Sequence, residues 1–275
     1  MEVEIETIPL IYKLDTLLIE LLASLQEEEW EAPTVAKFWR VKDVAAHLLD
    51  GNLRGLSTSR DHYFGEKAEK IQTYEDLVHF INQMNHSWVT ASRRISPKIL
   101  INLLEITGKQ YTDHLASLNP RDEAVFSVAW AGQSTSPNWF HIAREYTEKF
   151  LHQQQIREAT GRQKIMTREF FFPFLETLMR AFPYTFRKTL ASKGTKVGIE
   201  ISSEIGGMWV VELQEKWKLI PVDSSPLDAK VTIPPQVAWK LFSKSLRPEE
   251  VRNQVRMEGD PGLGYQALHL LGFMA

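Results

Sequence analysis

The sequence predicts two domains: an all-α N-terminal antiparallel helix bundle, and a C-terminal α+β domain with an antiparallel sheet. Up to about Gly161, apolar residues recur at three- and four-residue steps, which is the period of an amphipathic helix. Beyond that residue, short segments alternate apolar and polar side chains with a period of two, as in strands. The change of period places the boundary near 161–168, and we expect domains at 1–162 and 163–275.

Five long helices are expected in the first domain, and local signals mark their ends. Thr73 and Asp76 have the spacing of a capping box. Ser96 and Ser136 each precede a proline, which is typical of an N-cap followed by the first helical residue. Gly161 is a candidate C-cap. Long helices with short links favour an antiparallel bundle. We expect the helices at about 10–25, 41–64, from 73, from 96 past 115, and 136–161, with the longest link, 118–136, covering one end of the bundle.

The second domain is expected to mix strands and helices. A Gly206-Gly207 pair between two alternating segments indicates a hairpin. Pro234-Pro235 ends one strand and opens a short helix that contains Trp239. A sheet of this kind with helices beside it is an α+β architecture. We expect strands at 196–202, 208–213, 229–233 and 255–260, and helices at 166–182, around Trp239, and from 262 to the end.

Composition and charge exclude several functional classes. The net charge is −3, from 32 Lys+Arg and 35 Asp+Glu, so no electrostatic feature favours nucleic acid or an acidic membrane surface as a partner. The first residues are acidic where a secretory signal is basic. No segment reaches the roughly 20 apolar residues that span a bilayer. We therefore expect a cytoplasmic protein.

The chain contains no cysteine. A metal ion must therefore be bound by His, Asp, Glu or water, without thiolate ligands. A cysteine nucleophile is excluded as well. If a thiol takes part in the chemistry of this protein, it must arrive as a small molecule.

The expected fifth helix presents candidate metal ligands. Glu148 and His152 are four residues apart and so lie one above the other on one helix face. His141 and Glu145 continue the same stripe in a 4-3-4 rhythm. This spacing offers a carboxylate and an imidazole to one ion, as the HExxH motif offers two histidines. The alternative is an ordinary exposed Glu–His pair, which the same spacing produces by chance.

His47 completes a candidate set of three ligands. It lies among Val44, Leu48 and Leu49, so it is expected to point inward, either as a hydrogen-bonded core residue or as a ligand. With Glu148 and His152 it makes a two-histidine, one-carboxylate set. Three protein ligands leave an open position, which is typical of catalytic metal sites. We expect zinc or nickel, although the same set suits iron.

His141 and Glu145 are candidates for orienting those ligands. Simple exposure to solvent is the alternative for both. No glycine-rich phosphate loop and no nucleophile elbow occurs in the sequence.

Two segments resemble the DinB-like superfamily in its mycothiol-dependent maleylpyruvate isomerase branch. They are WRVKDVAAHL at 39–48 and REYTEKFLHQQQIREATG at 144–161. The resemblance covers roughly the first 160 residues and implies that His47, Glu148 and His152 bind one divalent metal. The stretch GGMWVVEL and the helix around Trp239 resemble the small sterol-carrier-like domain that follows in this branch.

The resemblance implies an isomerase or S-transferase that uses a low-molecular-weight thiol such as mycothiol, glutathione or bacillithiol on a small electrophile. It also implies an arginine of the C-terminal domain that contacts substrate carboxylates. No residue aligns with that arginine, and Arg252 and Arg256 are candidates only by charge and place. Two alternatives stay open. One is a binding protein with a structural metal and an apolar ligand in the C-terminal domain. The other is a scaffold whose bundle forms a homodimer.

Overall fold

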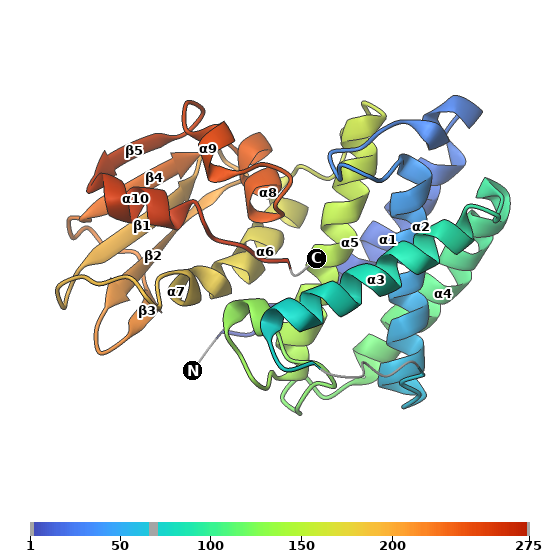
Figure 1. Cartoon of the computed structure of the whole chain (residues 1–275), viewed down its shortest axis with the longest axis horizontal. Helices are drawn as coiled ribbons and strands as arrows, with labels where there is room; N and C mark the ends of the chain where they lie inside the picture. Colours follow the sequence, from blue (N-terminus) through green and yellow to red (C-terminus); the bar gives the residue numbers. More distant parts are fainter. Residues whose placement is uncertain (1–2, 66–70, 274–275) are drawn as a thin grey trace. The chain divides into compact units, whose positions relative to one another are not determined.

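In the computed structural model, residues 3–65 and 71–273 are described, and the chain divides into two compact units (Figure 1). The first contains the residues up to Ser127 together with Thr135–Lys164. The second contains Val128–Ser134 and the chain from Ile165 onward. The expected link at 118–136 is thus divided, because its part at 128–134 belongs to the second unit. Gly132, at φ +78°, lies so close to Tyr184 that a Cβ would be 2.2 Å from its ring, which ties this segment to the second unit. The expected folding domains, 1–162 and 163–275, stay a prediction.

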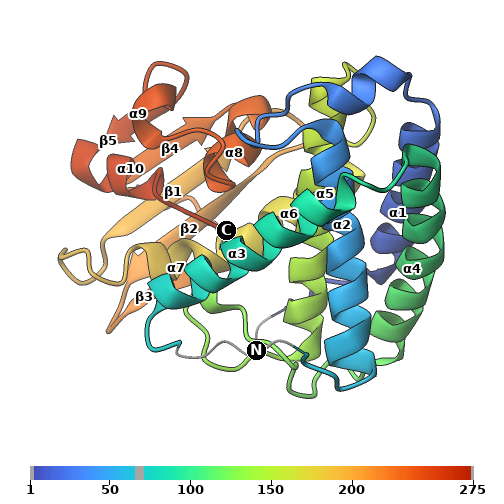
Figure 2. The same cartoon turned by 45° about the vertical axis from the view of Figure 1, so that its right-hand side comes forward.

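The first unit is all-helical. Helices α1 and α2 each pack against both α4 and α5, and α3 packs on α2; Figure 2 shows the four bundle helices side by side. Leucine and valine side chains such as Leu22, Val44 and Leu104 form its core. The elements are α1 (Ile8–Ala23), the 3-10 turn Glu27–Glu31, α2 (Val41–Gly55), the π-helical turn Leu56–Arg60, α3 (Tyr74–Ser92), α4 (Pro97–Ser117) and α5 (Asn138–Ala159).

Most of the expected helix ends are confirmed. Thr73 and Asp76 form the capping box, with backbone-to-side-chain bonds of 2.9 and 3.1 Å. The Ser96 side chain accepts from the backbone of Ile99 and caps α4. Gly161, at φ +67°, follows the end of α5 in the left-handed conformation that a helix C-terminus favours.

Two expected boundaries are wrong. Ser136 does not cap α5, because its carbonyl accepts from Ala124 and a β-bridge joins Glu123 to Pro137. Pro137 therefore has extended backbone and is the N-cap residue, and the helix begins at Asn138. The second helix ends at Gly55 rather than near 64, and a π-helical turn follows it.

The second unit contains a five-stranded sheet in the order β3-β2-β1-β4-β5. The expected antiparallel sheet is corrected to a mixed one, because β1 pairs with β4 in parallel. The strand at 217–220 was not expected, since four residues give too short an alternation to recognise. The elements are the 3-10 turn Ala129–Ala131, α6 (Arg168–Leu178), the 3-10 turn Met179–Ala181, α7 (Phe182–Thr185), β1 (Lys196–Ile201), β2 (Gly207–Leu213), β3 (Trp217–Ile220), β4 (Ala229–Ile233), α8 (Pro235–Phe242), α9 (Pro248–Val251), β5 (Arg256–Gly259) and α10 (Pro261–Ala267).

The parallel pair arises because the chain crosses the sheet between β3 and β4. The crossing segment lies over one face, where Leu227 approaches Gly198 so closely that a Cβ there would be 2.7 Å from it. The other face carries Ile199, Trp209 and Val231, which lie opposite one another in register. Helices α6 and α10 cover that face: Phe172 stacks on Trp209 at 5.7 Å, and α10 packs on β1, β4 and β5. The end of the expected last helix, at 274–275, lies outside the described residues.

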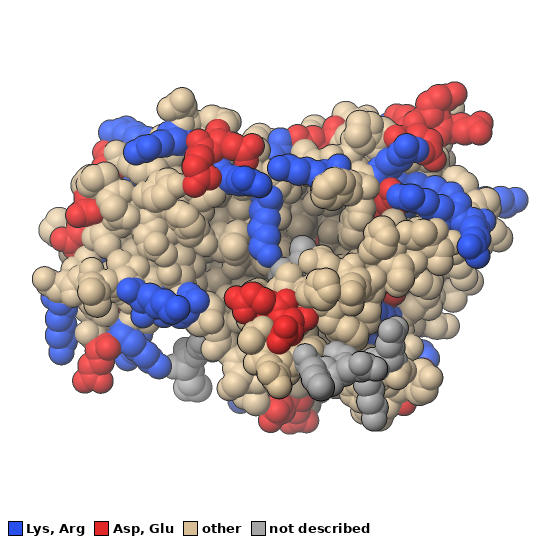
Figure 3. Space-filling model, viewed as in Figure 1, with Lys and Arg blue, Asp and Glu red and all other residues tan. Residues whose placement is uncertain are grey.

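Surface charge in the structure agrees with the balanced composition. Basic and acidic side chains are interspersed on the face shown in Figure 3. None of the helices in the described part of the chain combines the length and the apolar character needed to cross a bilayer.

A buried polar network joins the four bundle helices. Lys149 on α5 donates to Asp15 on α1 at 2.6 Å and to Asn52 on α2 at 3.1 Å. Asp15 also accepts from Thr112 on α4 at 2.9 Å, and Asn52 donates to Thr107 on the same helix at 3.3 Å. A buried charge without its partner is costly, so the network favours one register of the four helices over the others.

We expect Lys149→Met to lower the free energy of unfolding by about 3–5 kcal/mol, because it leaves the Asp15 carboxylate largely buried without its cation. Chemical denaturation measures this change. Lys109→Met is the matched control, since its pair with Asp113 is exposed, with side chains 73% and 47% accessible. Loss of that pair should cost far less, because solvent screens both charges. Equal effects of the two substitutions would contradict a structural role for the network.

His141 is a second buried titratable group of α5. It is 3% exposed. Its pKa is lowered to about 4, mainly by burial and also by the nearby Arg144 guanidinium, while Glu145 partly opposes both. Between about pH 4 and pH 6.5 the unfolded chain therefore binds a proton at this imidazole that the folded chain does not. Stability must fall as the pH is lowered through this window, and it is unaffected by this group above it.

We expect the unfolding free energy of the wild type to fall from pH 6.5 to pH 5 more steeply than that of His141→Gln. The difference in slope should approach about 1.4 kcal/mol per pH unit. Urea denaturation in the presence of a chelator measures both slopes, and the interval from pH 7 to 8 provides the internal control. Parallel curves across the acid window would show that this imidazole titrates alike in both states.

Candidate metal centre

The structure brings His47, Glu148 and His152 together between α2 and α5. One ligand atom of each lies within 4.8 Å of those of the other two. The Nε2 atom of His152 is 3.3 Å from Oε2 of Glu148, as expected for an i,i+4 pair on one helix face. The two imidazole rings lie edge to face, with centroids 4.6 Å apart. His152 is buried and the other two are half-buried, so this pair is not the freely exposed one of the alternative interpretation.

Local packing explains why His47 faces α5. Val44, Ala45, Leu48 and Leu49 are buried in the core of the bundle, which fixes the rotation of α2 about its axis. His47 lies at the edge of that buried face. Asp43 accepts from the backbone of Arg40 at 3.1 Å and holds the first turn of the helix in place. The ligand position is therefore set by the amphipathic pattern of α2.

The electrostatics of the site keep His47 neutral. Burial holds the pKa of its imidazole well below the usual range, and His152 and Arg54 lower it further. A neutral imidazole has a lone pair for a metal ion. Its Nδ1 atom is buried and has no hydrogen-bond partner among the described residues. A buried polar atom of this kind is costly, so the residues present fit an additional group bound at this imidazole.

Gln155 supports the second histidine. Its side-chain Oε1 lies 2.9 Å from Nδ1 of His152. When Nδ1–H donates to this amide, Nε2 presents its lone pair toward Glu148. Sequence reasoning did not single out this role, although three glutamines follow His152 directly. The signal was the three-residue step from His152 to Gln155, which places both side chains on one face.

His141 and Glu145 lie on the same stripe of α5, on the N-terminal side of Glu148. They contact each other and Arg144 rather than the three candidate ligands. Nη2 of Arg144 is 3.3 Å from Nδ1 of His141. Arg144 also forms an ion pair with Glu145, and Tyr111 of α4 is hydrogen-bonded to Glu145. Arg144 is close enough to Glu148 for that carboxylate to raise its pKa. A supporting role of His141 and Glu145 at the metal site therefore acts through Arg144, and it stays a proposal.

An aromatic side chain that the sequence analysis missed lies against both histidines. The Trp39 ring centroid is 4.8 Å from that of His47 and 6.3 Å from that of His152. Trp39 comes from the loop that precedes α2 and is half-buried. Its place in the sequence, eight residues before His47, gave no periodic signal, because Trp39 lies in the loop and outside the helix.

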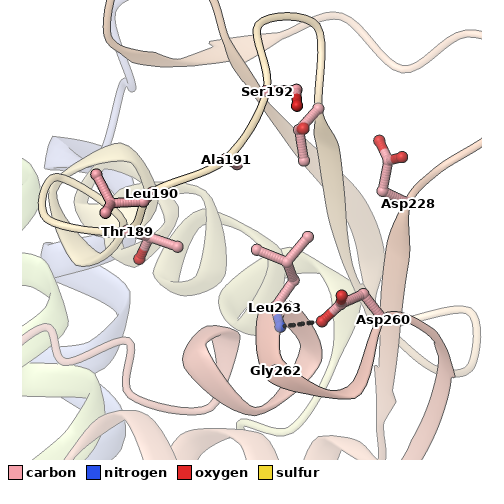
Figure 4. A pocket seen from close by; sticks show the side chains of 9 residues that line it. Thr189, Leu190, Ala191, Ser192, Asp228, Asp260, Gly262 and Leu263 are labelled. Atoms are coloured by element: carbon pink, nitrogen blue, oxygen red, sulfur yellow. Dashed lines mark hydrogen bonds between the residues drawn. The ribbon is translucent and has the colours of Figure 1, made fainter.

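Among its described residues, the second unit offers no comparable set of possible metal ligands. A hollow of about 480 Å³ is lined by Thr189, Ser192, Asp228 and Asp260 among others (Figure 4). Its carboxylates have structural roles: Asp260 caps α10 at Leu263, and Asp228 accepts from the backbone of Lys196. Leu190, Ala191 and Leu263 also line the hollow, so its lining is mixed and does not by itself favour an apolar ligand.

The two candidate arginines of the second unit are exposed. Arg256 pairs with Glu258 at 2.9 Å. Arg252 lies over the ring of Tyr265 at 5.9 Å. Neither contact identifies a substrate-binding arginine.

Comparisons with known proteins agree with the fold. A crystal structure of a variant of the mycothiol-dependent maleylpyruvate isomerase matches with a TM-score of 0.55 at 11% identity, covering 91% of each chain. A second structure of that isomerase matches with a TM-score of 0.51 at 12% identity, over 85% of this chain and 86% of that one. A sterol carrier protein domain of Helicoverpa armigera covers 35% of this chain and 82% of its own, at 19% identity, but its TM-score of 0.27 supports no argument.

No curated protein matches the chain in sequence. A family model does match it, over residues 13–157, and its description is mycothiol maleylpyruvate isomerase N-terminal domain. The matched residues contain α2, α4 and nearly all of α5, and with them His47, Glu148 and His152. Because the match extends over more than half of the chain, the protein belongs to the mycothiol maleylpyruvate isomerase N-terminal domain family.

Proposed function

We propose that this protein is a divalent-metal-dependent isomerase or transferase that uses a low-molecular-weight thiol on a small electrophilic substrate. The observation that carries the proposal is the convergence of His47, Glu148 and His152, one of which has a buried nitrogen without a partner. Membership in the family supports the thiol and the reaction class. The solved relatives of similar fold are described as mycothiol-dependent maleylpyruvate isomerases.

The donor set suits zinc or nickel, because two imidazoles and one carboxylate are ligands that such ions accept. A divalent ion held there supplies a Lewis acid that favours the deprotonated form of a thiol. Three protein donors leave room for that thiol. The protein prepares both imidazoles for metal binding. Burial keeps His47 neutral, and Gln155 orients His152 through the Nδ1 atom of that histidine.

The thiol must come from outside the chain, since the sequence contains no cysteine. A thiolate sulfur adds to an electrophilic carbon of a conjugated double bond: a carbon–sulfur bond forms, the carbon–carbon π bond breaks, and its electrons pass to the carbonyl as an enolate. The enolate then either expels the sulfur and re-forms the double bond or takes up a proton at carbon. In an isomerase the sulfur leaves again after bond rotation and the thiol is regenerated. In a transferase the carbon–sulfur bond persists and one thiol is consumed per product. Measuring thiol consumption distinguishes the two reactions.

We expect purified wild-type protein to bind one divalent ion, and His47→Ala, Glu148→Gln and His152→Ala each to bind it more than about 100-fold more weakly. The loss should exceed the 10–100-fold effect that is typical of residues outside the coordination sphere. Competition with a chromophoric chelator measures the affinity, and elemental analysis identifies the ion. His79→Ala is the control, because His79 is an exposed imidazole on α3. Equal binding by the wild type and the three variants would refute the metal centre.

Metal binding should also appear as stability. With free metal at about 100 times its dissociation constant, the free energy of unfolding of the wild type should rise by about 2.7 kcal/mol, because the ion binds only the folded chain. Thermal unfolding with and without a chelator measures the gain. His47→Ala should show none. A gain of the same size in that variant would place the ion at other residues.

Turnover should require an added thiol. We expect metal-loaded protein to convert maleylpyruvate or a related small electrophile with mycothiol, glutathione or bacillithiol present, and to be inactive without a thiol. Absorbance of the substrate follows turnover, and a thiol reagent follows consumption. His79→Ala should keep the activity and His152→Ala should lose it. Turnover at the same rate without any thiol would contradict the proposed chemistry.

A further inference from the structure

The two histidines of the candidate metal centre are supported in different ways. Nδ1 of His152 has the side-chain oxygen of Gln155 at 2.9 Å. Neither ring nitrogen of His47 has a hydrogen-bond partner among the described residues, so no hydrogen bond orients this ring, whichever nitrogen faces the ion. Only one of the two imidazoles is therefore oriented by a hydrogen bond.

Orientation matters because a histidine ligand must aim one nitrogen at the ion. A hydrogen bond from the other nitrogen normally fixes the ring, and its loss weakens metal binding by about 10–100-fold. Rotamer preference does not replace it, since the χ2 torsion of histidine is broad. Some other contact must hold the His47 ring in the direction that the structure shows.

Trp39 is the side chain that can do so. Its ring centroid lies 4.8 Å from that of His47, with the two planes tilted by 47°. The same indole lies 6.3 Å from His152. The two imidazole rings also contact each other edge to face, with centroids 4.6 Å apart, so all three rings are in mutual contact. Packing of this kind restricts the rotation of an imidazole ring without using either of its nitrogens.

Trp39 is itself well anchored. Its backbone N–H donates to Ala36 at 2.7 Å. Its carbonyl accepts from the backbone of Thr34 at 3.2 Å and from the Thr34 hydroxyl at 2.8 Å. Helix α2 begins two residues later, at Val41. The indole is thus held by the turn before the helix, while His47 is held by the helix.

We propose that Trp39 is a positioning residue of the metal centre: its indole orients the His47 imidazole for metal binding, as Gln155 orients that of His152. The inference rests on the proposed metal centre. The role requires the aromatic ring and no hydrogen bond from it. A phenylalanine at this position should therefore retain most of the function, and an aliphatic side chain should not.

The test compares metal affinity among four variants by competition with a chromophoric chelator. We expect Trp39→Leu to bind Zn²⁺ about 10–100-fold more weakly than the wild type, as for other residues that orient ligands. Trp39→Phe should stay within tenfold of the wild type. Gln155→Leu should resemble Trp39→Leu. Trp88→Phe is the matched control, because Trp88 is also half-buried beside α2 but donates to the Ala46 carbonyl.

Two further readouts separate positioning from general stability. Unfolding of the metal-free variants measures the structural cost, and Trp88→Phe should lose stability without losing affinity. The visible absorption spectrum of bound Co²⁺ reports the coordination geometry, and it should change in Trp39→Leu but not in Trp88→Phe.

Three results would overturn the inference while leaving the metal centre intact. These are wild-type affinity in Trp39→Leu, an affinity loss in Trp88→Phe as large as that in Trp39→Leu, or a loss in Trp39→Phe as large as that in Trp39→Leu. Failure of the wild type to bind any divalent ion would instead refute the proposed metal centre itself.

Discussion

The packing of α2 against α5 is the constraint on which the candidate site depends. It brings His47 to a pair that lies far along the chain, and no local interaction could do this. Burial of Val44, Ala45 and Leu49 in the bundle core sets the rotation of α2. The three donor atoms then converge to within 4.8 Å. A rotation of α2 by one residue, about 100° around the helix axis, would remove His47 from the site altogether.

Helix α5, which supplies two of the three candidate ligands, buries many polar groups. α5 buries Lys149, His152, Gln153 and Gln155 along with its aromatic residues. Each needs a partner, and most have one: Lys149 binds Asp15 and Asn52, and Gln153 donates to the Leu14 carbonyl at 2.8 Å. Such pairing adds little net stability compared with apolar packing. It does favour one register of α5 in the bundle, and an ion site with donors on two helices requires one register. Among the described residues, the side-chain amide of Gln154 on α5 is an exception, and so is Nδ1 of His47 on α2, which lies at the candidate metal site.

Much of the fold follows from periodicity in the sequence. The five long helices and four of the five strands lie where the apolar pattern placed them, because burial of one face imposes the period of each element. The errors come from interactions between elements. Serine is a residue type that favours the N-cap position, and Ser136 was expected there. Glu123 instead forms a β-bridge with Pro137, and the helix begins one residue later than expected, at Asn138. Alternation identified β1 and β4 as strands, but it contains no information on whether two strands pair in parallel.

For the site, the sequence by itself determined the donors that were available. The absence of cysteine restricted the ligands, helical spacing joined Glu148 to His152, and the apolar neighbours of His47 pointed it inward as a third candidate. Resemblance to a family implied that the three bind one metal. Only the tertiary structure decided how those ligands are supported. Gln155 lies on the same helix as His152 and could be inferred from spacing, whereas Trp39 reaches His47 through the turn before α2. A ring contact between a loop and a helix depends on backbone direction, and no periodic pattern encodes that direction.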